Sequence, residues 1–362
     1  MRYLAVDIGA SSGRHIVAEI KDGRLSLREV YRFPNGPRRT ADGLVWDADA
    51  LYSHIIEGLK AADAAGLRPD CVGIDTWAVD YVLLDRDGKR IGPAFCYRDE
   101  RGAEAARRFH EAMPFETLYK KTGIQYQPFN TVYQLYADKL SGRLDRAAAM
   151  LMLPDWFNYR LTGVRLQEYT NATSTGMVGA LTDDWDDEIL SAAGVSRSLL
   201  GKVTRPAVKV GSFSPETRRE VGYDAVVMLP ATHDTASAVV AAPVEKGGAY
   251  ISSGTWSLLG AERARAITSE AAMRGNWSNE GGAFGGFRFQ KNIMGLWMVQ
   301  QVRHELGDAY TFAQLAETAR AHPTDKRVRV NDEKFLSADS MLDAIFSEAG
   351  NMALGETAYC IF

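Results

Sequence analysis

The hydrophobic and polar positions at the start of the chain are arranged as short strands separated by tight turns. An apolar run at residues 3–6 leads into a polar glycine/serine turn at residues 7–14, and a second strand-like run follows at residues 15–20. A second turn signal, Asp22-Gly23, comes next, and the leucines at 25 and 27 alternate with polar residues beyond it. This pattern predicts a three-stranded antiparallel meander over the first 33 residues.

Helical and strand-like patterns alternate through the rest of the first half. Leu51, Ile55, Ile56 and Leu59 have helical spacing and follow a candidate cap at residues 46–49. Residues 100–200 are largely helical in pattern. Short apolar runs predict buried strands at residues 71–74, 81–84 and 225–229. We therefore predict an α/β fold whose mixed sheet is started by antiparallel strands.

The chain carries no low-complexity stretch or charge run that would mark a linker. A second α/β unit opens with the strand at 225–229, so we place the boundary just before His233, giving domains 1–232 and 233–362. The last ten residues predict a helix that ends on Ile361-Phe362 without a glycine, a proline or a basic last turn. Such an ending is typical of a docked terminal helix or of a second domain that is incomplete in this chain.

Composition narrows the classes of function. At 362 residues the chain is long enough for two domains. Its net charge of −4 offers no general attraction to nucleic acid or to an anionic membrane, and no uncharged apolar run approaches the length of a bilayer span.

The amino terminus and the cysteines indicate a compartment. The terminus leaves no room for a signal-peptide core, and the three cysteines, without C-x-x-C spacing, fit a reducing environment. The six histidines show no metal-ligand spacing, which argues against zinc chemistry. We expect a cytoplasmic protein; the sequence leaves its oligomeric state open, and a monomer is compatible with it.

Two polar loops far apart in the chain have the same character. Residues 7–14 and residues 252–255 each follow an apolar run and lead into another strand-like run. Glycine/serine turns of this kind expose backbone N–H groups and hydroxyls, which suit phosphate. Neither loop has the spacing of a Walker or a dinucleotide-binding motif. The pair predicts an ATP-handling protein that grips the nucleotide from both sides of a cleft, although each loop alone also fits a purely structural hairpin.

His233-Asp234-Thr235 is the best candidate for catalysis. Asp234 follows a predicted buried strand and starts a predicted helix, so its carboxylate should project at the edge of a cleft. There it would accept the proton of a substrate hydroxyl that attacks the γ-phosphate of ATP. The competing interpretation is that Asp234 only caps the following helix, and His233 by itself is also typical of a core histidine.

Other candidate residues lie in the two polar loops and after the strand predicted at residues 71–74. Asp7 ends the first strand, where a carboxylate can hold Mg²⁺ through water. Arg14 closes the loop and is suited to γ-phosphate oxygens, or is a surface cation. Thr255 offers its hydroxyl and N–H from the second loop. Trp77 would pack on the apolar face of a sugar, or lies in the core as most tryptophans do.

An ordered set of motifs runs over the whole chain. These motifs are Asp7-Ile8-Gly9-Ala10-Ser11-Ser12-Gly13-Arg14, Gly73-Ile74-Asp75-Thr76-Trp77, Met152-Leu153-Pro154-Asp155, Tyr169-Thr170-Asn171-Ala172-Thr173, His233-Asp234-Thr235-Ala236-Ser237-Ala238, Ser252-Ser253-Gly254-Thr255-Trp256-Ser257 and Lys291-Asn292-Ile293-Met294-Gly295-Leu296-Trp297. Together they resemble the FGGY carbohydrate kinases, and among them those that act on L-rhamnulose. The resemblance implies two actin-like (ribonuclease-H-like) domains around a cleft, and phosphorylation of L-rhamnulose at its 1-hydroxyl by MgATP in rhamnose catabolism.

The resemblance also implies roles for individual residues. Asp234 matches the catalytic base, and His233, Thr235 and Asn292 match positions that contact the sugar. Asp7 resembles the Mg²⁺-associated carboxylate. The nucleotide contacts match Ala10, Ser11, Ser12, Gly13, Arg14, Thr255 and Gln300.

Two departures from the family pattern affect this interpretation. Ala78 stands where the family often has a glycine against the sugar, so its methyl group either tightens that part of the pocket or is tolerated there. The family also continues beyond the position of Phe362 to a glycine-rich motif that holds the adenosine. We therefore interpret the second domain as incomplete in this chain. The alternatives are a family member acting on a related ketose, and a non-catalytic actin-like nucleotide-binding protein.

Overall fold

The predicted amino-terminal meander is confirmed by the structure, a computed structural model that describes residues 1–245, 247–254, 256–335 and 338–362. Strands β1 (Arg2–Ile8), β2 (Ser12–Lys21) and β3 (Arg24–Pro34) pair antiparallel in sequence order. The polar loop at residues 9–11 joins β1 to β2, so the first candidate phosphate loop is a turn between two strands.

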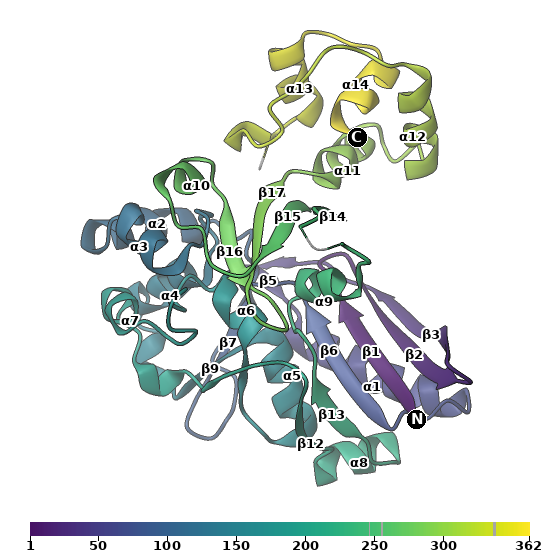
Figure 1. Cartoon of the computed structure of the whole chain (residues 1–362), viewed down its shortest axis with the longest axis vertical. Helices are drawn as coiled ribbons and strands as arrows, with labels where there is room; N and C mark the ends of the chain where they lie inside the picture. Colours follow the sequence, from purple (N-terminus) through teal and green to yellow (C-terminus); the bar gives the residue numbers. More distant parts are fainter. Residues whose placement is uncertain (246, 255, 336–337) are drawn as a thin grey trace. The chain divides into compact units, whose positions relative to one another are not determined.

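The meander forms half of a six-stranded mixed sheet. Its strand order is β12-β13-β6-β1-β2-β3, and β6 (Cys71–Thr76) runs parallel both to β1 and to β13 (Val226–Leu229). Strand β12 (Val208–Ser212) completes the edge antiparallel to β13. Figure 1 shows this sheet with β6 and β1 side by side. Because β1, β6 and β13 share one direction, their carboxyl ends meet at the same edge of the sheet.

Helix α1 (Ala48–Ala64) covers part of this sheet with the apolar face that its spacing predicts. Asp47 caps it by accepting a hydrogen bond from the N–H of Ala50. Ile55 and Leu59 are fully buried in the same apolar cluster as residues of β1 and β6. Burying aliphatic side chains of this size stabilises a fold by about 1.5–3 kcal/mol each, so packing against the sheet holds this helix in place.

The region predicted to be largely helical forms a second apolar core within the same unit. Helices α2 (Arg101–Ala112) and α4 (Thr131–Leu140) pack together there, and β7 (Tyr81–Leu84) pairs with β9 (Ala149–Met152). The remaining elements of this part of the chain are β4 (Arg38–Thr40), β5 (Gly43–Trp46), β8 (Ala94–Phe95), α3 (Phe115–Thr122), α5 (Leu153–Thr162), β10 (Gln167–Glu168), α6 (Tyr169–Ser174), α7 (Asp187–Ala193), β11 (Val203–Thr204), α8 (Pro215–Val221) and α9 (Asp234–Ala241), with single helical turns at Leu144–Arg146 and Arg197–Leu199.

The carboxyl-terminal third contains a second sheet and a group of helices. Its strand order is β14-β15-β17-β16, formed by β14 (Tyr250–Ser253), β15 (Ser257–Arg263), β17 (Phe287–Ile293) and β16 (Ser278–Gly281). The helices are α10 (Glu270–Arg274), α11 (Leu296–Glu305), α12 (Phe312–Ala321), α13 (Met341–Ala349) and α14 (Leu354–Ile361), with a single turn at Glu333–Phe335. The predicted last helix is confirmed as α14, and Ile361 is buried in an apolar cluster with residues of α11 and α13.

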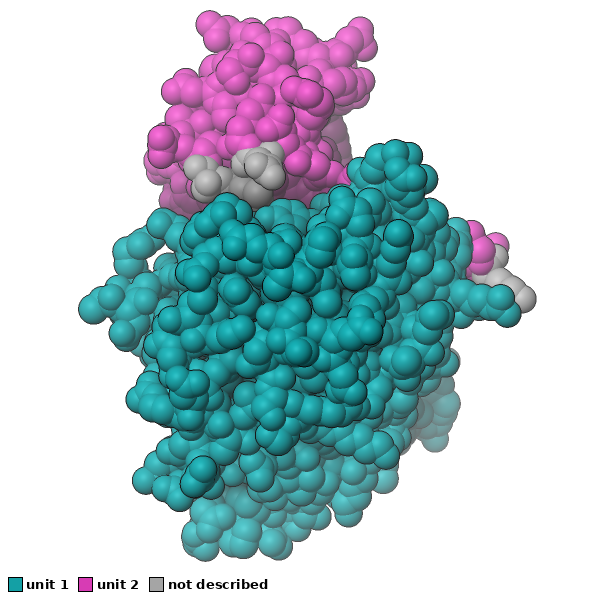
Figure 2. All heavy atoms as spheres, turned by 90° about the vertical axis from the view of Figure 1, so that its left-hand side faces the viewer, with its two compact units in different colours: residues 1–242, 262–289 teal, residues 243–261, 290–362 magenta. Residues whose placement is uncertain are grey.

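Contacts divide the chain into two compact units, which Figure 2 distinguishes by colour. Unit 1 comprises residues 1–242 and 262–289, and unit 2 comprises residues 243–261 and 290–362. The chain therefore leaves unit 1 after α9, enters unit 2, and returns once through β15 before leaving again along β17. The domain boundary proposed just before His233 stays a prediction.

Within the residues that the structure describes, every helix is too short or too polar to cross a membrane.

Candidate active site

Three carboxylates lie at the edge of the first sheet where its parallel strands end. Asp7 in β1 is paired in register with Asp75 in β6. Thr76, the next residue of β6, forms an isolated parallel bridge with His233, and Asp234 follows it. Crevices outside the carboxyl ends of parallel strands are the usual ligand sites of α/β sheets. The fold thus brings together Asp7 and Asp234, which the sequence places more than 200 residues apart.

The three carboxylates influence one another electrostatically. Burial raises the pKa of Asp7, the Arg14 guanidinium opposes this rise, and the charge of Asp234 adds to it. Burial also raises the pKa of Asp75 well above its usual range, and the charges of Asp7 and Asp234 raise it further. Like charges held close together disfavour ionisation. A cation bound at this edge would relieve that repulsion.

The loop after β1 contains two backbone N–H groups without a partner among the described residues. Within the loop, the N–H of Gly9 donates to the carbonyl of Ser12 at 2.9 Å. Asn35 donates its backbone N–H to the carbonyl of Ser11 and its side-chain amide to that of Gly9. Among the hydrogen bonds of the described residues, none uses the N–H of Ala10 or Ser11 as donor. Two neighbouring N–H groups without partners form the concave donor surface that binds phosphate.

Gly13 and Arg14, at the end of this loop, already have roles in the fold. Gly13 lies opposite Phe33 of β3, and a Cβ at this position would come within 2.1 Å of the Phe33 ring. Glycine is therefore required here for packing. Arg14 forms an ion pair with Asp7, with 3.2 Å between Nε and Oδ2, and both side chains are partly exposed. A phosphate contact of Arg14 stays a prediction.

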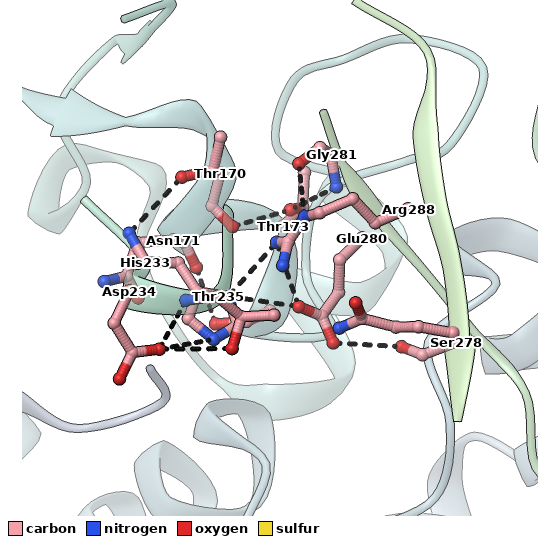
Figure 3. Close-up of polar contacts among 12 residues, drawn as sticks. Thr170, Asn171, Thr173, His233, Asp234, Thr235, Ser278, Glu280, Gly281 and Arg288 are labelled. Carbon is pink, nitrogen blue, oxygen red and sulfur yellow. Dashed lines mark hydrogen bonds and ion pairs between the residues drawn. The ribbon is translucent and has the colours of Figure 1, made fainter. Parts of the chain in front are cut away.

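Asp234 is the first residue of α9, and His233 occupies the cap position without a capping side-chain hydrogen bond. The Oδ1 atom of Asp234 accepts hydrogen bonds from the N–H of Thr235 at 2.5 Å and from its hydroxyl at 3.2 Å. Its side chain is 35% exposed, and Figure 3 shows dashed contacts to one carboxylate oxygen only. One carboxylate oxygen of Asp234 thus binds the first turn of its helix, and the other is available to accept a proton.

His233 is buried against a charged pair that sequence reasoning missed. Its Nδ1 atom lies 3.1 Å from Glu280 Oε2 and 3.1 Å from Arg288 Nη2, and the guanidinium donates to the same Glu280 oxygen. On the other side of the ring, Nε2 lies 3.5 Å from Asp234 Oδ1. Figure 3 shows these contacts together. Glu280 and Arg288 come from β16 and β17 and are almost fully buried.

A second buried carboxylate, also missed from sequence, holds the segment that precedes His233. Glu168 Oε2 accepts hydrogen bonds from the N–H of Thr232 at 3.1 Å and from its hydroxyl at 2.9 Å. The other oxygen of Glu168 accepts the N–H of Thr170 at the start of α6. The Thr170 hydroxyl in turn accepts the N–H of His233. Glu168 therefore ties α6 to the chain segment that carries the candidate base.

The loop after β6 contains Ala78 between two well-held residues. Trp77 is buried, its ring centroid lies 4.3 Å from that of Trp46 in a tilted contact, and its indole N–H donates to Asp80, which supports the core interpretation of Trp77. The carbonyl of Ala78 accepts the N–H of Asp80. Val79 has a φ of 68°, which is unusual for a β-branched residue. Ala78 is partly exposed, and its contact with a sugar stays a prediction.

The candidates in the second half of the chain belong mainly to unit 2. Asn292 lies near the end of β17, and its Oδ1 is buried with no hydrogen-bond partner among the described residues. Gln300 lies on α11. Thr255 falls outside the residues that the structure describes. Strands β14 and β15, which precede and follow it in the sequence, pair antiparallel, as the strand-loop-strand pattern predicts. The ligand contacts of these residues stay predictions.

A metal site made by protein side chains alone is absent from the described part of the chain, because no group of three or more His, Cys, Asp or Glu side chains is arranged to hold an ion. Mg²⁺ usually keeps several waters and takes one or two carboxylates together with substrate phosphates. The carboxylate of Asp7 beside a donor-rich loop fits that mode of binding.

Comparison with known proteins places the chain among sugar kinases. Residues 2–241 match the N-terminal domain of the FGGY family of carbohydrate kinases. A rhamnulokinase from Oceanobacillus iheyensis is 43% identical over 99% of this chain and 78% of its own length. A rhamnulokinase from Halalkalibacterium halodurans is 45% identical over 100% of this chain and 79% of its own length. The chain thus spans somewhat less than four fifths of these relatives.

A solved structure shares the fold. The ligand-bound xylulose kinase from Lactobacillus acidophilus superimposes with a TM-score of 0.75 at 16% identity, covering 89% of this chain and 66% of that one. At this identity the likeness concerns the fold alone. It confirms the predicted α/β architecture of actin-like type.

Proposed function

Because the chain belongs to the FGGY family of carbohydrate kinases, we propose that it transfers the γ-phosphoryl group of ATP to the 1-hydroxyl of L-rhamnulose. The products are ADP and L-rhamnulose 1-phosphate. Relatives named rhamnulokinase that match almost the whole chain support this choice of sugar. The observation that carries the reaction is the position of Asp234 at the same sheet edge as Asp7 and the loop at residues 9–11.

Asp234 is the base in this proposal. The sugar oxygen attacks the γ-phosphorus and forms the new O–P bond, while the bond from that phosphorus to the β–γ bridging oxygen breaks and ADP leaves with the electron pair. The hydroxyl proton passes to the Asp234 carboxylate. The oxygen not held by Thr235 is available for this transfer. General-base assistance of this kind is worth roughly 10²–10⁴ in rate.

The loop after β1 would bind phosphate oxygens of ATP. The N–H groups of Ala10 and Ser11 are donors without partners among the described residues, and Ser12 and Arg14 lie beside them. Asp7 would hold Mg²⁺, which when bound neutralises charge on the phosphate oxygens. The use of ATP also supports the expectation of a cytoplasmic enzyme.

Four residues are proposed as contacts of the sugar. His233 and Thr235 flank the base, and Ala78 lies on the loop after β6. The buried acceptor of Asn292 would find its donor in a sugar hydroxyl, because a buried oxygen without a partner costs about 1–3 kcal/mol. Thr255 and Gln300 are proposed as further nucleotide contacts.

The test is an acceptor panel with a matched pair of variants. The protein is mixed with MgATP and L-rhamnulose, L-fuculose or D-xylulose, ADP release is followed by a coupled assay, and the phosphorylated carbon is assigned by NMR. We expect release that depends on L-rhamnulose. In Asp234→Asn, kcat should fall by roughly 10²–10⁴, with a similar KM for ATP.

Asp187→Asn is the control, because Asp187 is likewise the first residue of a helix, α7, but lies on an exposed surface. This variant should keep the wild-type rate. ATP hydrolysis that needs no sugar and is unchanged in Asp234→Asn would refute Asp234 as the base. If the protein prefers another ketose, that ketose is the substrate in place of L-rhamnulose.

A further inference from the structure

The His233 ring is held between two charged groups whose hydrogen-bonding roles are fixed by their chemistry. An arginine guanidinium only donates hydrogen bonds, and an ionised carboxylate only accepts them. Arg288 is 1% exposed, and its Nη2 atom lies 3.1 Å from Nδ1 of the histidine ring. For this contact to be a hydrogen bond, Nδ1 must offer its lone pair.

The contact on the opposite side of the ring also favours a lone pair on Nδ1 and a proton on Nε2. Nε2 of His233 lies 3.5 Å from Oδ1 of Asp234. A ring with its only proton on Nδ1 would set the Nε2 lone pair against a carboxylate oxygen, so that two acceptors would face each other. A ring with the proton on Nε2 turns this contact into an attraction. The contact with Asp234 and the contact with Arg288 therefore both favour the proton on Nε2, whereas the Glu280 oxygen 3.1 Å from Nδ1 competes for a proton on that nitrogen.

Glu280 supplies the negative charge that compensates the buried guanidinium of Arg288. Its Oε2 atom accepts from Arg288 at 3.1 Å, and both side chains are buried. A buried cation without a paired anion is strongly unfavourable, so Glu280 permits Arg288 to stand beside the histidine. The same oxygen also lies 3.1 Å from Nδ1 of His233. If Arg288 were removed, Glu280 would be the charged group remaining at Nδ1, and the best arrangement would place a proton there.

We propose that Arg288 is a positioning residue, which donates to Nδ1 of His233 and so keeps the ring proton on Nε2, directed at the carboxylate of Asp234. This inference rests on the proposed function of Asp234 as the base. The Nε2 proton and the two donors of Thr235 then face the same oxygen, Oδ1. The other oxygen of Asp234 is left to receive the substrate proton. Arg288 thus acts on the reaction through His233, without touching the substrate.

The experiment reads the ring nitrogens directly. The protein is labelled with ¹⁵N-histidine, and the His233 signals are assigned by their loss in His233→Gln. In the wild type we expect a protonated Nε2 and an unprotonated Nδ1. In Arg288→Met, Nδ1 should become protonated as it donates to Glu280, and kcat should fall about 10- to 100-fold, the range expected for a lost hydrogen bond to a charged group, while the KM for ATP stays the same.

Two further variants separate positioning from general stability. Arg288→Lys keeps a buried donor, so it should keep Nδ1 unprotonated and recover part of kcat. Arg143→Met removes another largely buried arginine of unit 1, which pairs with Asp138 at 2.7 Å. Arg143→Met should lower stability, because it leaves a buried carboxylate with fewer partners, but it should leave the His233 nitrogen signals as they are.

Each result of these experiments either supports or overturns the proposed role of Arg288. A protonated Nδ1 in the wild type would overturn the proposal, as would unchanged nitrogen signals and kcat in Arg288→Met. If Arg288→Met does not fold, the spectra of the wild type and of Arg288→Lys still show which ring nitrogen of His233 carries the proton. If the wild type phosphorylates no ketose, the proposed function fails, whereas the spectrum continues to test the position of the proton.

Discussion

Replacing Asp80 by Asn removes a buried carboxylate from the centre of a hydrogen-bonded group next to Ala78. Asp80 is 1% exposed. Its Oδ2 accepts the indole N–H groups of Trp46 and Trp77 at 2.6 and 2.9 Å and the backbone N–H of Tyr97 at 3.1 Å. Its Oδ1 accepts the side-chain amide of Gln134 at 3.0 Å. The variant therefore tests how a buried negative charge affects the loop that follows β6.

The expected magnitude follows from the pKa of Asp80. Burial raises this pKa from an ordinary value of 3.8 to about 6, although the hydrogen bonds of the carboxylate oppose the rise. Between these two values the folded chain binds a proton that the unfolded chain has lost. The free energy of unfolding therefore decreases as the pH rises from about 4 to 6, and a shift of this size corresponds to about 3 kcal/mol.

Asparagine has no titration in this range, so the comparison isolates the contribution of Asp80. Its carbonyl oxygen can take the place of Oδ2, but its amide nitrogen then faces the donor of Gln134, and one hydrogen bond worth about 1 kcal/mol is lost. At pH 4 we expect the wild type to be more stable by about this amount. At pH 7 the order should reverse, with Asp80→Asn more stable by about 2 kcal/mol.

Urea unfolding at pH 4, 5, 6 and 7, followed by tryptophan fluorescence and circular dichroism, measures this difference. The exposed Asp42→Asn serves as a control, because a surface change usually alters stability by less than about 0.5 kcal/mol. Two stability curves for the wild type and Asp80→Asn that stay parallel from pH 4 to 7 would refute the reasoning. That result would mean that Asp80 ionises as easily in the folded chain as in the unfolded one.

Three further substitutions test the site. Gly13→Ala should lower the free energy of unfolding in urea by about 1–3 kcal/mol, because its methyl group meets the Phe33 ring. Gly36→Ala, with open space around it, should leave this free energy unchanged. Equal stability of the two variants would contradict the packing role of Gly13. Glu168→Gln should lower the melting temperature and kcat together, because it weakens charged hydrogen bonds worth about 1.5–3 kcal/mol each; a fall in stability with an unchanged kcat would separate Glu168 from the site. Asp7→Asn should raise the Mg²⁺ concentration for half-maximal rate by about 10- to 100-fold, and titrations that coincide with the wild type would exclude Asp7 as the metal carboxylate.

Local patterns predicted much of the fold because they depend on residues close in sequence. The Asp22-Gly23 turn joins β2 to β3 as expected, and Ile55 and Leu59 are buried on one face of α1. Asp234 begins a helix directly after a buried strand, as its neighbours indicate. Each of these features is set by turn chemistry or by hydrophobic periodicity over about ten residues, so a single sequence contains the necessary information.

The buried charges around His233 could not be predicted in the same way. Arg288 contacts His233 across 55 positions of sequence, and Glu168 contacts Thr232 across 64. The local hydrogen bonds of Glu168 cap α6 and do not indicate its contact with Thr232. The one available signal for Arg288 is its position between two phenylalanines at the start of a strand, and Glu280, in the polar run Ser278–Gly281, has no comparable signal.

The sequence by itself determined the amino-terminal meander, the helix-starting position of Asp234 and the resemblance to sugar kinases, because each depends on short runs of residues in a given order. Only the tertiary structure decided which of these residues meet. The parallel pairing of β1 with β6 and the bridge from Thr76 to His233 bring Asp7, Asp75 and Asp234 to one edge of the sheet. Pairing of distant strands sets these neighbours, and burial then shifts the pKa values of Asp7 and Asp75. Both effects depend on long-range contacts that no local pattern contains.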